Sequence, residues 1–267
     1  MIRMPVVAGQ FYNGNKKGLE HQIKHLMPEG RVKEKVLGAL CPHAGFMYSG
    51  AVAGEVYSYI KAPETFILLG PNHTGYGEQF AIMSKGKWEI PTAVFDIDES
   101  LSFAIMKNSW LFKEDSLAHM NEHSLEVQLP FIANYAANSK IIPITMMHAS
   151  IKQCMEAGEA IAKAIKESGK EVVIIASSDM SHYISDKRAR ERDSLVEDRL
   201  LALDPVGMYD IVLKEKITMC GYIPSTVMLY AAIALGATRV TKVQYTTSAE
   251  VSGDYSHVVG YLGVLVQ

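Results

Sequence analysis

Three histidines directly follow stretches whose apolar character is typical of buried strands. His43 follows Val36–Leu40 within Cys-Pro-His-Ala-Gly, and His73 follows Thr65–Leu69 within Gly-Pro-Asn-His. The third stretch, Glu171–Ser177, leads into Ser-Asp-Met-Ser-His, which ends in His182. In open α/β sheets, ligands bind in the crevice beyond the carboxyl ends of the strands. A single histidine there can be a loop or capping residue, but three such histidines favour one shared functional pocket.

Two further groups are candidates for proton transfer beside these histidines. Asp179 leaves the same strand end as His182, within Ser-Asp-Met-Ser-His. His123 lies at the predicted start of an amphipathic helix, where Glu126 would share its face and orient the imidazole. The alternative is that Glu122 and Glu126 only complement the positive end of the helix. A hydrolytic trio of serine, aspartate and histidine within this one short segment is a weaker hypothesis, because adjacent positions rarely place a nucleophile against its base.

Cys220 precedes the predicted helix Ser225–Leu235, which Pro224 introduces. A thiol near a helix N-terminus can have a lowered pKa and serve as a thiolate ligand or nucleophile, although a small packed residue is the alternative. Imidazole and thiolate donors favour iron or copper, with zinc also suitable, over magnesium or calcium. Three protein ligands leave a coordination position for a small-molecule or peptide ligand in the cleft.

The elements that must position these side chains alternate along the chain. Near-continuous apolar runs, typical of strands covered on both faces, are Val36–Leu40, Thr65–Leu69, Lys140–Met146 and Glu171–Ser177. Helical patterns follow Ser49 and Asn121 and occupy Ile151–Lys166, Ser194–Leu203 and Ser225–Leu235. Strands are also predicted at the periphery, near Phe80–Ser84 and Trp88–Val94, and at the end of the chain, over Arg239–Ala249 and Val258–Val266. This alternation predicts a three-layer α/β/α sandwich around a mainly parallel or mixed central sheet.

Composition indicates one globular domain over residues 1–267, with 48% hydrophobic and 21% charged residues and no linker or repeat. The net charge of -3 and the scattered basic residues argue against nucleic-acid binding. No apolar stretch approaches the ~20 residues that a membrane span needs, and no export signal is recognisable at the start. Three widely separated cysteines favour the reducing cytoplasm.

Ordered motifs along nearly the whole chain carry a resemblance to a known family. They are Arg3–Tyr12, Pro42-His-Ala-Gly45, Leu69-Gly-Pro-Asn-His73, Glu122-His-Ser-Leu-Glu126, Ser177-Ser-Asp-Met-Ser-His182 and Met219-Cys-Gly221. The sequence resembles the Memo family, whose fold is similar to class III extradiol dioxygenases of the protocatechuate 4,5-dioxygenase type. This resemblance implies metal-ligand positions and, in the same pocket, acid/base groups. The ligand positions would be His43, His73 and Cys220, and the acid/base groups His123, Asp179 and His182.

The resemblance also sets limits on the activity. Dioxygenases of this type complete their iron site with a carboxylate, whereas Cys220 stands in that place here. A thiolate changes the potential of iron and is itself oxidisable, which argues against ring cleavage. Microbial members are associated with AMMECR-type and radical-SAM proteins, which implies partners of those kinds.

Two functional hypotheses follow. The first is a metal-dependent redox or oxygenase-like enzyme, in which the metal binds an exogenous ligand and His182 or His123 moves a proton. The second is a non-catalytic metal-binding or protein/peptide-recognition module that retains an enzyme-like cleft. Fold similarity does not decide between them, because function resides in the site.

Overall fold

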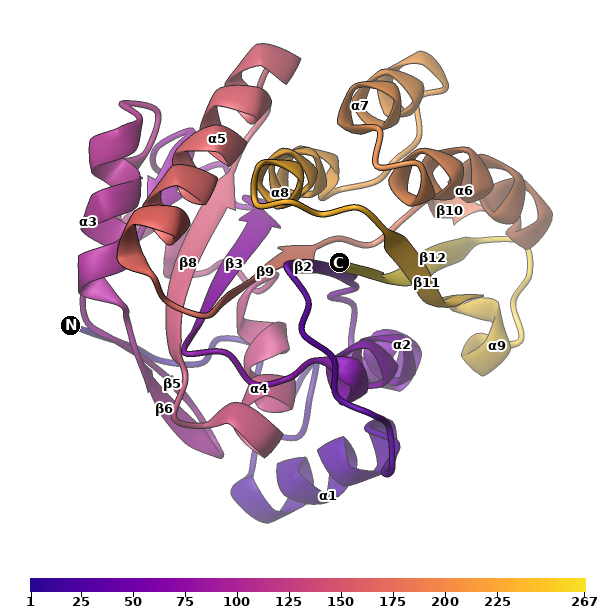
Figure 1. Ribbon diagram of the computed structural model, residues 1–267. Helices are drawn as coiled ribbons and strands as arrows, with labels where there is room; N and C mark the ends of the chain where they lie inside the picture. The colour runs from indigo at the N-terminus through magenta and orange to yellow at the C-terminus, as the bar shows by residue number, and fades with distance from the viewer.

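The centre of the molecule is a parallel sheet built from the apolar runs of the sequence. A computed structural model describes residues 1–267 and is shown as a ribbon in Figure 1. The central strands lie in the order β2 (Gly38–Cys41), β9 (Val172–Ser177), β3 (Thr65–Pro71) and β8 (Lys140–Met146), and every neighbouring pair is parallel. These strands are buried along almost their whole length, as their continuous apolarity predicts.

Antiparallel strands extend both edges of this sheet and make it mixed. Beside β2 lies β12 (Val258–Val266), which also pairs with β11 (Val240–Thr247) and with β10 (His182–Ile184). At the other edge, β4 (Phe80–Ile82) runs antiparallel to β8 and parallel to β7 (Lys113–Glu114). The predicted mixed sheet is therefore confirmed.

Helices cover both faces of the sheet (Figure 1). One face carries α1 (Lys16–Leu26), α2 (Phe46–Tyr59) and α4 (Leu129–Ala136); the other carries α3 (Glu99–Asn108), α5 (Ile151–Ser168), α6 (Asp186–Leu201), α7 (Pro205–Lys214) and α8 (Tyr222–Ala234). Alternate strand residues feed two separate cores. For example, Leu40 and Ile67 pack towards α5 and α8, whereas Ala39 and Phe66 pack towards α2 and α4. The predicted three-layer sandwich is confirmed.

Smaller elements complete the chain. A three-stranded sheet contains β1 (Ile2–Arg3), β5 (Lys87–Ile90) and β6 (Ala93–Asp96), so the predicted peripheral stretch Trp88–Val94 is part of a hairpin. Short helices are η1 (Leu117–His119), η2 (Glu126–Gln128) and α9 (Ala249–Ser252). None of the helices combines the length and the apolar character needed to cross a bilayer.

The helix predicted after Asn121 begins later than the sequence pattern indicates. Helical structure starts only at Glu126, as the 3-10 turn η2, and the α-helix α4 follows with Pro130 in its first turn. The carboxylates of Glu122 and Glu126 are engaged in contacts with other segments of the chain rather than in capping the helix. Residues 121–125 therefore form a turn that carries His123 into the site.

Candidate metal centre

The carboxyl ends of the parallel strands deliver the predicted site residues to one edge of the sheet. His43 follows β2, His73 follows β3, and Asp179 and His182 follow β9. Cys220 immediately precedes the cap of α8, which packs on the same strands. This is the arrangement that the positions of these residues after buried strands predict.

These residues surround one open pocket of about 500 Å³. All six residues that the sequence singles out line it, namely His43, His73, His123, Asp179, His182 and Cys220. The rest of the lining is mostly small or aromatic and includes Phe11 and Tyr183. Neither lysine nor arginine lines the pocket.

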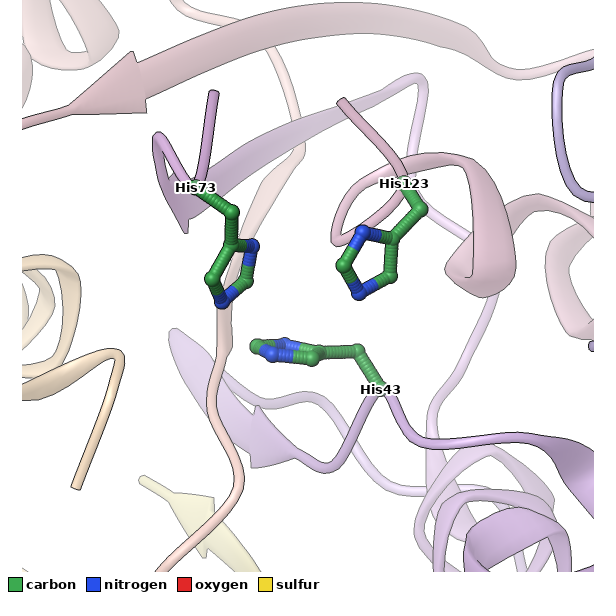
Figure 2. Close-up of side chains that lie close together, drawn as sticks. All are labelled: His43, His73 and His123. Carbon is green, nitrogen blue, oxygen red and sulfur yellow. The ribbon is translucent and has the colours of Figure 1, made fainter. Parts of the chain in front are cut away.

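Three imidazoles form the tightest group of metal-binding atoms in the pocket. One ring nitrogen from each of His43, His73 and His123 lies within 4.8 Å of the others. The rings of His73 and His123 are stacked with their centroids 4.8 Å apart, and His43 meets both edge-on. Figure 2 shows the three side chains converging on one small space. His123, which the sequence assigned to proton transfer, therefore stands among the possible ligands.

Glu122 orients His73. Its buried carboxylate accepts hydrogen bonds from His73 Nδ1 at 2.9 Å, from the backbone N–H of His73 at 2.5 Å and from that of Ser124 at 2.8 Å. Burial opposes ionisation of Glu122, but the hydrogen bonds and charge of His73 outweigh it and lower the pKa of Glu122 to about 2. A carboxylate only accepts, so the neutral ring of His73 carries its proton on Nδ1 and leaves Nε2 unprotonated.

Glu122 also faces His123, with its Oε1 at 3.5 Å from His123 Nδ1. The prediction that Glu126 orients His123 is wrong, because the Glu126 carboxylate belongs to a separate buried network of hydrogen bonds. It pairs with Arg3 and accepts hydrogen bonds from the backbone N–H of Val6 and from the Tyr12 hydroxyl. Both glutamates could be seen in the sequence, but only contacts between distant segments decide that Glu122, and not Glu126, faces His123.

His43 is held from two sides. Its backbone N–H donates to Asp179 Oδ1 at 2.8 Å, and its Nδ1 lies 2.9 Å from the Ser177 hydroxyl oxygen. Burial, followed by repulsion from the neighbouring histidines, holds the pKa of His43 well below its usual value. His43 is therefore neutral at physiological pH, as a metal ligand requires.

Cys220 contacts His43 but is not part of the group of three imidazoles whose ligand atoms all lie within 4.8 Å of one another. Its Sγ lies 3.2 Å from His43 Nε2 and accepts a hydrogen bond from the backbone N–H of Asp179 at 3.4 Å. The expected low thiol pKa is wrong for the metal-free protein, because burial raises the pKa of Cys220 to about 12. Desolvation of the thiolate outweighs the helix N-terminus here.

Asp179 and His182 both line the pocket, but no hydrogen bond joins their side chains. Asp179 accepts from the backbone N–H groups of His43 and Ala44, and burial raises its pKa. The ring of His182 instead donates from Nδ1 to the carbonyl oxygen of Thr218 at 2.8 Å, which leaves its Nε2 unprotonated in the neutral ring. Asp179 therefore orients the backbone at His43, not the imidazole of His182.

The hydrolytic alternative in this segment is also wrong. The hydroxyl of Ser178 donates to the backbone carbonyl of Asp179 at 2.8 Å and accepts from the backbone N–H of Gly221 at 2.8 Å. It makes no hydrogen bond with His182, so no base is placed to activate it.

The donor set fits a transition metal. His43 Nε2 and Cys220 Sγ lie 3.2 Å apart, so both could bind one ion, and imidazole nitrogen and thiolate sulfur are donors that suit iron, copper and zinc. Buried partners, Glu122 and Ser177, fix the rings of His73 and His43 in the manner typical of metal-binding histidines. Sequence reasoning gave neither residue this role: it weighed Glu122 only as a complement to a helix terminus, and Ser177 appeared only as the first residue of a motif.

Comparison with known proteins agrees with these observations. The profile of the family described as Memo-like protein matches residues 3–265. This chain belongs to the Memo family. A MEMO1 family protein of Methanosarcina mazei is 42% identical over 100% of this chain and 99% of its own, and one of Aquifex aeolicus is 40% identical over 99% and 98%.

A solved structure supports the fold of this Memo family member. The crystal structure of an uncharacterized protein from Escherichia coli K12 covers 86% of this chain and 99% of its own, with a TM-score of 0.58. Its sequence identity is 10%, so the likeness concerns the fold alone.

Proposed function

We propose that the pocket binds a transition metal ion through His43, His73 and Cys220, with iron(II) or copper preferred and zinc also accepted. His123 is the neighbouring imidazole, close enough to exchange a proton with a bound ligand or to approach the ion. The observation that carries the proposal is the convergence of three imidazole nitrogens within 4.8 Å, with a thiol beside them. Imidazole and thiolate together are the ligands that these metals favour.

We further propose that the protein is a metal-dependent redox or oxygenase-like enzyme acting on a small molecule or peptide in the cleft. A bound iron or copper ion would supply Lewis-acid and one-electron chemistry at its open position. His182 holds an unprotonated Nε2 in its neutral form and accepts a proton at the rim. His123, whose pKa burial lowers, is a second neutral acceptor.

The lining of the pocket also restricts the ligand. With no lysine or arginine present, a carboxylate or phosphate on the ligand meets no permanently cationic side chain. Asp179, whose pKa burial raises, can hold a proton close to the entering group. The pocket thus favours a ligand whose only strong electrostatic contact is with the ion.

Metal content tests the proposal. We expect wild-type protein loaded anaerobically with iron(II), then desalted, to retain close to one ion per chain by elemental analysis. His43→Ala and His73→Ala should each lose at least ~10-fold in occupancy, because every ligand of a three-ligand site is needed. His257→Ala is the matched control, since His257 is exposed in the loop before β12. Equal occupancy in all four proteins would contradict the proposal.

Oxygen consumption tests the enzymatic part. With ascorbate as the reductant, the copper-loaded or iron-loaded wild type should consume O₂ faster than the same concentration of free metal. His182→Ala should retain metal but slow the reaction by ~10²- to 10⁴-fold, the usual contribution of a general acid or base. Full metal retention with no O₂ consumption by the wild type would favour the recognition module instead.

A further inference from the structure

A buried chain of hydrogen bonds runs behind His43, on the side away from the pocket. It connects Tyr57 in α2, Gln128 in η2 and Ser177 at the end of β9, all of which are fully buried. Ser177 Oγ reaches His43 Nδ1 at 2.9 Å, and Gln128 Nε2 reaches Ser177 Oγ at 2.8 Å. Because each group in such a chain has a limited number of protons and lone pairs, the direction of every bond can be worked out.

The orientation of the Gln128 amide is fixed by its other two contacts. Its Nε2 lies 3.0 Å from the carbonyl oxygen of Pro42, which can only accept. Its Oε1 lies 3.1 Å from the hydroxyl of Tyr57, which donates to it. The reversed amide would put two oxygens together at Pro42, so Gln128 directs its second N–H at Ser177.

The single proton of Ser177 is committed elsewhere. Its hydroxyl donates to the carbonyl oxygen of Ser124 at 2.7 Å and accepts the N–H of Gln128. One lone pair of Ser177 Oγ then remains, and it faces His43 Nδ1. A ring nitrogen in that position satisfies the contact only by donating a proton.

We infer that Ser177 and Gln128 are positioning residues that hold the proton of neutral His43 on Nδ1 and so present the lone pair of Nε2 to the pocket. The Cys220 thiol, 3.2 Å from Nε2, is then the donor in the metal-free protein. This inference rests on the proposed function only in that Nε2 is the proposed ligand atom. The proton's position itself is a property of the metal-free chain.

One short segment, residues 122–128, therefore orients both histidines. Glu122 accepts the Nδ1 proton of His73, and Gln128 with the Ser124 carbonyl sets the direction of Ser177 beneath His43. Partners of this kind typically change metal affinity by about 10- to 100-fold when removed. Both ligand nitrogens are thus prepared before an ion arrives, which removes the need to rearrange tautomers on binding.

The tautomer can be measured directly in metal-free protein. Long-range ¹H–¹⁵N correlation spectra distinguish the protonated from the unprotonated nitrogen of each imidazole. We expect His43 in the wild type to show a protonated Nδ1 and an unprotonated Nε2. In Ser177→Ala, both nitrogen shifts of His43 should move towards the averaged values of a mixed population, because the acceptor is gone.

Ser58→Ala is the matched control, since it removes another buried hydroxyl that donates to a backbone carbonyl but touches no histidine. It should leave the shifts of His43 unchanged. A wild type with the proton on Nε2 would overturn the inference, even if Ser177→Ala does not fold. Unchanged shifts in a folded Ser177→Ala protein would overturn it as well.

Zinc titration separates this inference from the proposed function. Ser177→Ala should bind zinc about 10- to 100-fold more weakly than the wild type, with Ser58→Ala unaffected. If the tautomer shifts as expected but the wild type binds no zinc, the inference stands and the proposed metal site fails. If zinc binds tightly but Ser177→Ala matches the wild type in zinc affinity and in the nitrogen shifts of His43, Ser177 and Gln128 have no positioning role.

Discussion

Two side chains, those of Cys220 and His123, are candidates for the third ligand of the proposed metal site. Cys220 Sγ lies 3.2 Å from His43 Nε2, whereas His123 and not Cys220 belongs to the group of three side chains whose ligand atoms lie within 4.8 Å of one another. We expect Cys220→Ser to lower iron occupancy sharply, because a neutral hydroxyl replaces a thiolate poorly. Cys154→Ser, in the buried face of α5, is the matched control and should retain the ion. Equal metal content in the two variants would assign the third position to His123.

Glu122 makes the stability of the protein depend on pH. Its pKa is about 2 when folded, against an ordinary value of 4.5, so it stabilises the fold fully above pH 4.5 and loses this effect as the pH falls towards 2. We expect Glu122→Gln to lower the free energy of unfolding by up to about 3 kcal/mol at pH 7. Urea denaturation at pH 7 and pH 3 checks this. A difference that does not shrink at pH 3 would exclude Glu122 as the source.

Most single residues of the site could be predicted because their positions in the sequence are informative. His43, His73 and His182 follow buried strands, and parallel strands bring such positions together. Glu122 and Ser177 could not be assigned, because their roles arise from hydrogen bonds between segments far apart in the chain. The prediction of a low pKa for Cys220 was wrong for a related reason, since the burial that raises this pKa depends on tertiary packing.

At the scale of elements, the N-terminal segment fastens the turn that carries His123. The Arg3 guanidinium is fully buried over the ring of Trp88, pairs with Glu126, and donates to the carbonyl oxygen of Glu122 at 2.6 Å. The ring of Phe11, in the same segment, contacts His123 with centroids 4.9 Å apart. The contacts of Arg3 and Phe11 therefore fix the position of the turn that carries His123 at the pocket.

Loss of the buried pair between Arg3 and Glu126 should destabilise the fold. Glu126→Gln leaves the buried charge of Arg3 unpaired, so we expect the free energy of unfolding to fall by about 3–5 kcal/mol. Glu167→Gln removes one partner of an exposed pair with Lys163 on α5 and should change it by less than about 0.5 kcal/mol. Similar effects of the two variants in urea denaturation would mean that the buried pair is not essential to the fold.

Strands were predicted more accurately than the turn beside the site. Thr65–Leu69 and Lys140–Met146 lie within β3 and β8, because a strand buried on both faces must be continuously apolar. The predicted start of the helix after Asn121 was wrong, because Glu122 and Glu126 accept hydrogen bonds from other segments instead of capping the helix. Local pattern does not reveal that competition.

For the whole molecule, the alternation of strands and helices predicted the layers but not the strand order. The insertion of β9 between β2 and β3 joins segments that are distant in sequence, and no local pattern encodes it. The two hydrophobic cores share the strands of one sheet, so we expect the loss of one core to destabilise the other.

We therefore expect residues 1–267 to unfold as one cooperative unit. In a Trp110→Phe variant, which lacks the exposed tryptophan, fluorescence reports on the core around buried Trp88, and far-ultraviolet circular dichroism reports on all helices. The two signals should give coincident urea transitions in metal-free protein. Separate midpoints would show that the two faces of the sheet behave as independent domains.

The central claim is that a metal ion binds in the pocket through His43, His73 and Cys220. Anomalous diffraction from crystals soaked with iron(II), recorded on both sides of the iron absorption edge, tests it most directly. We expect one peak, at about 2.0–2.3 Å from His43 Nε2, His73 Nε2 and Cys220 Sγ. A peak confined to the exposed pair His21 and His25 on α1, whose rings lie 4.2 Å apart, would contradict the account, as would no peak in the pocket.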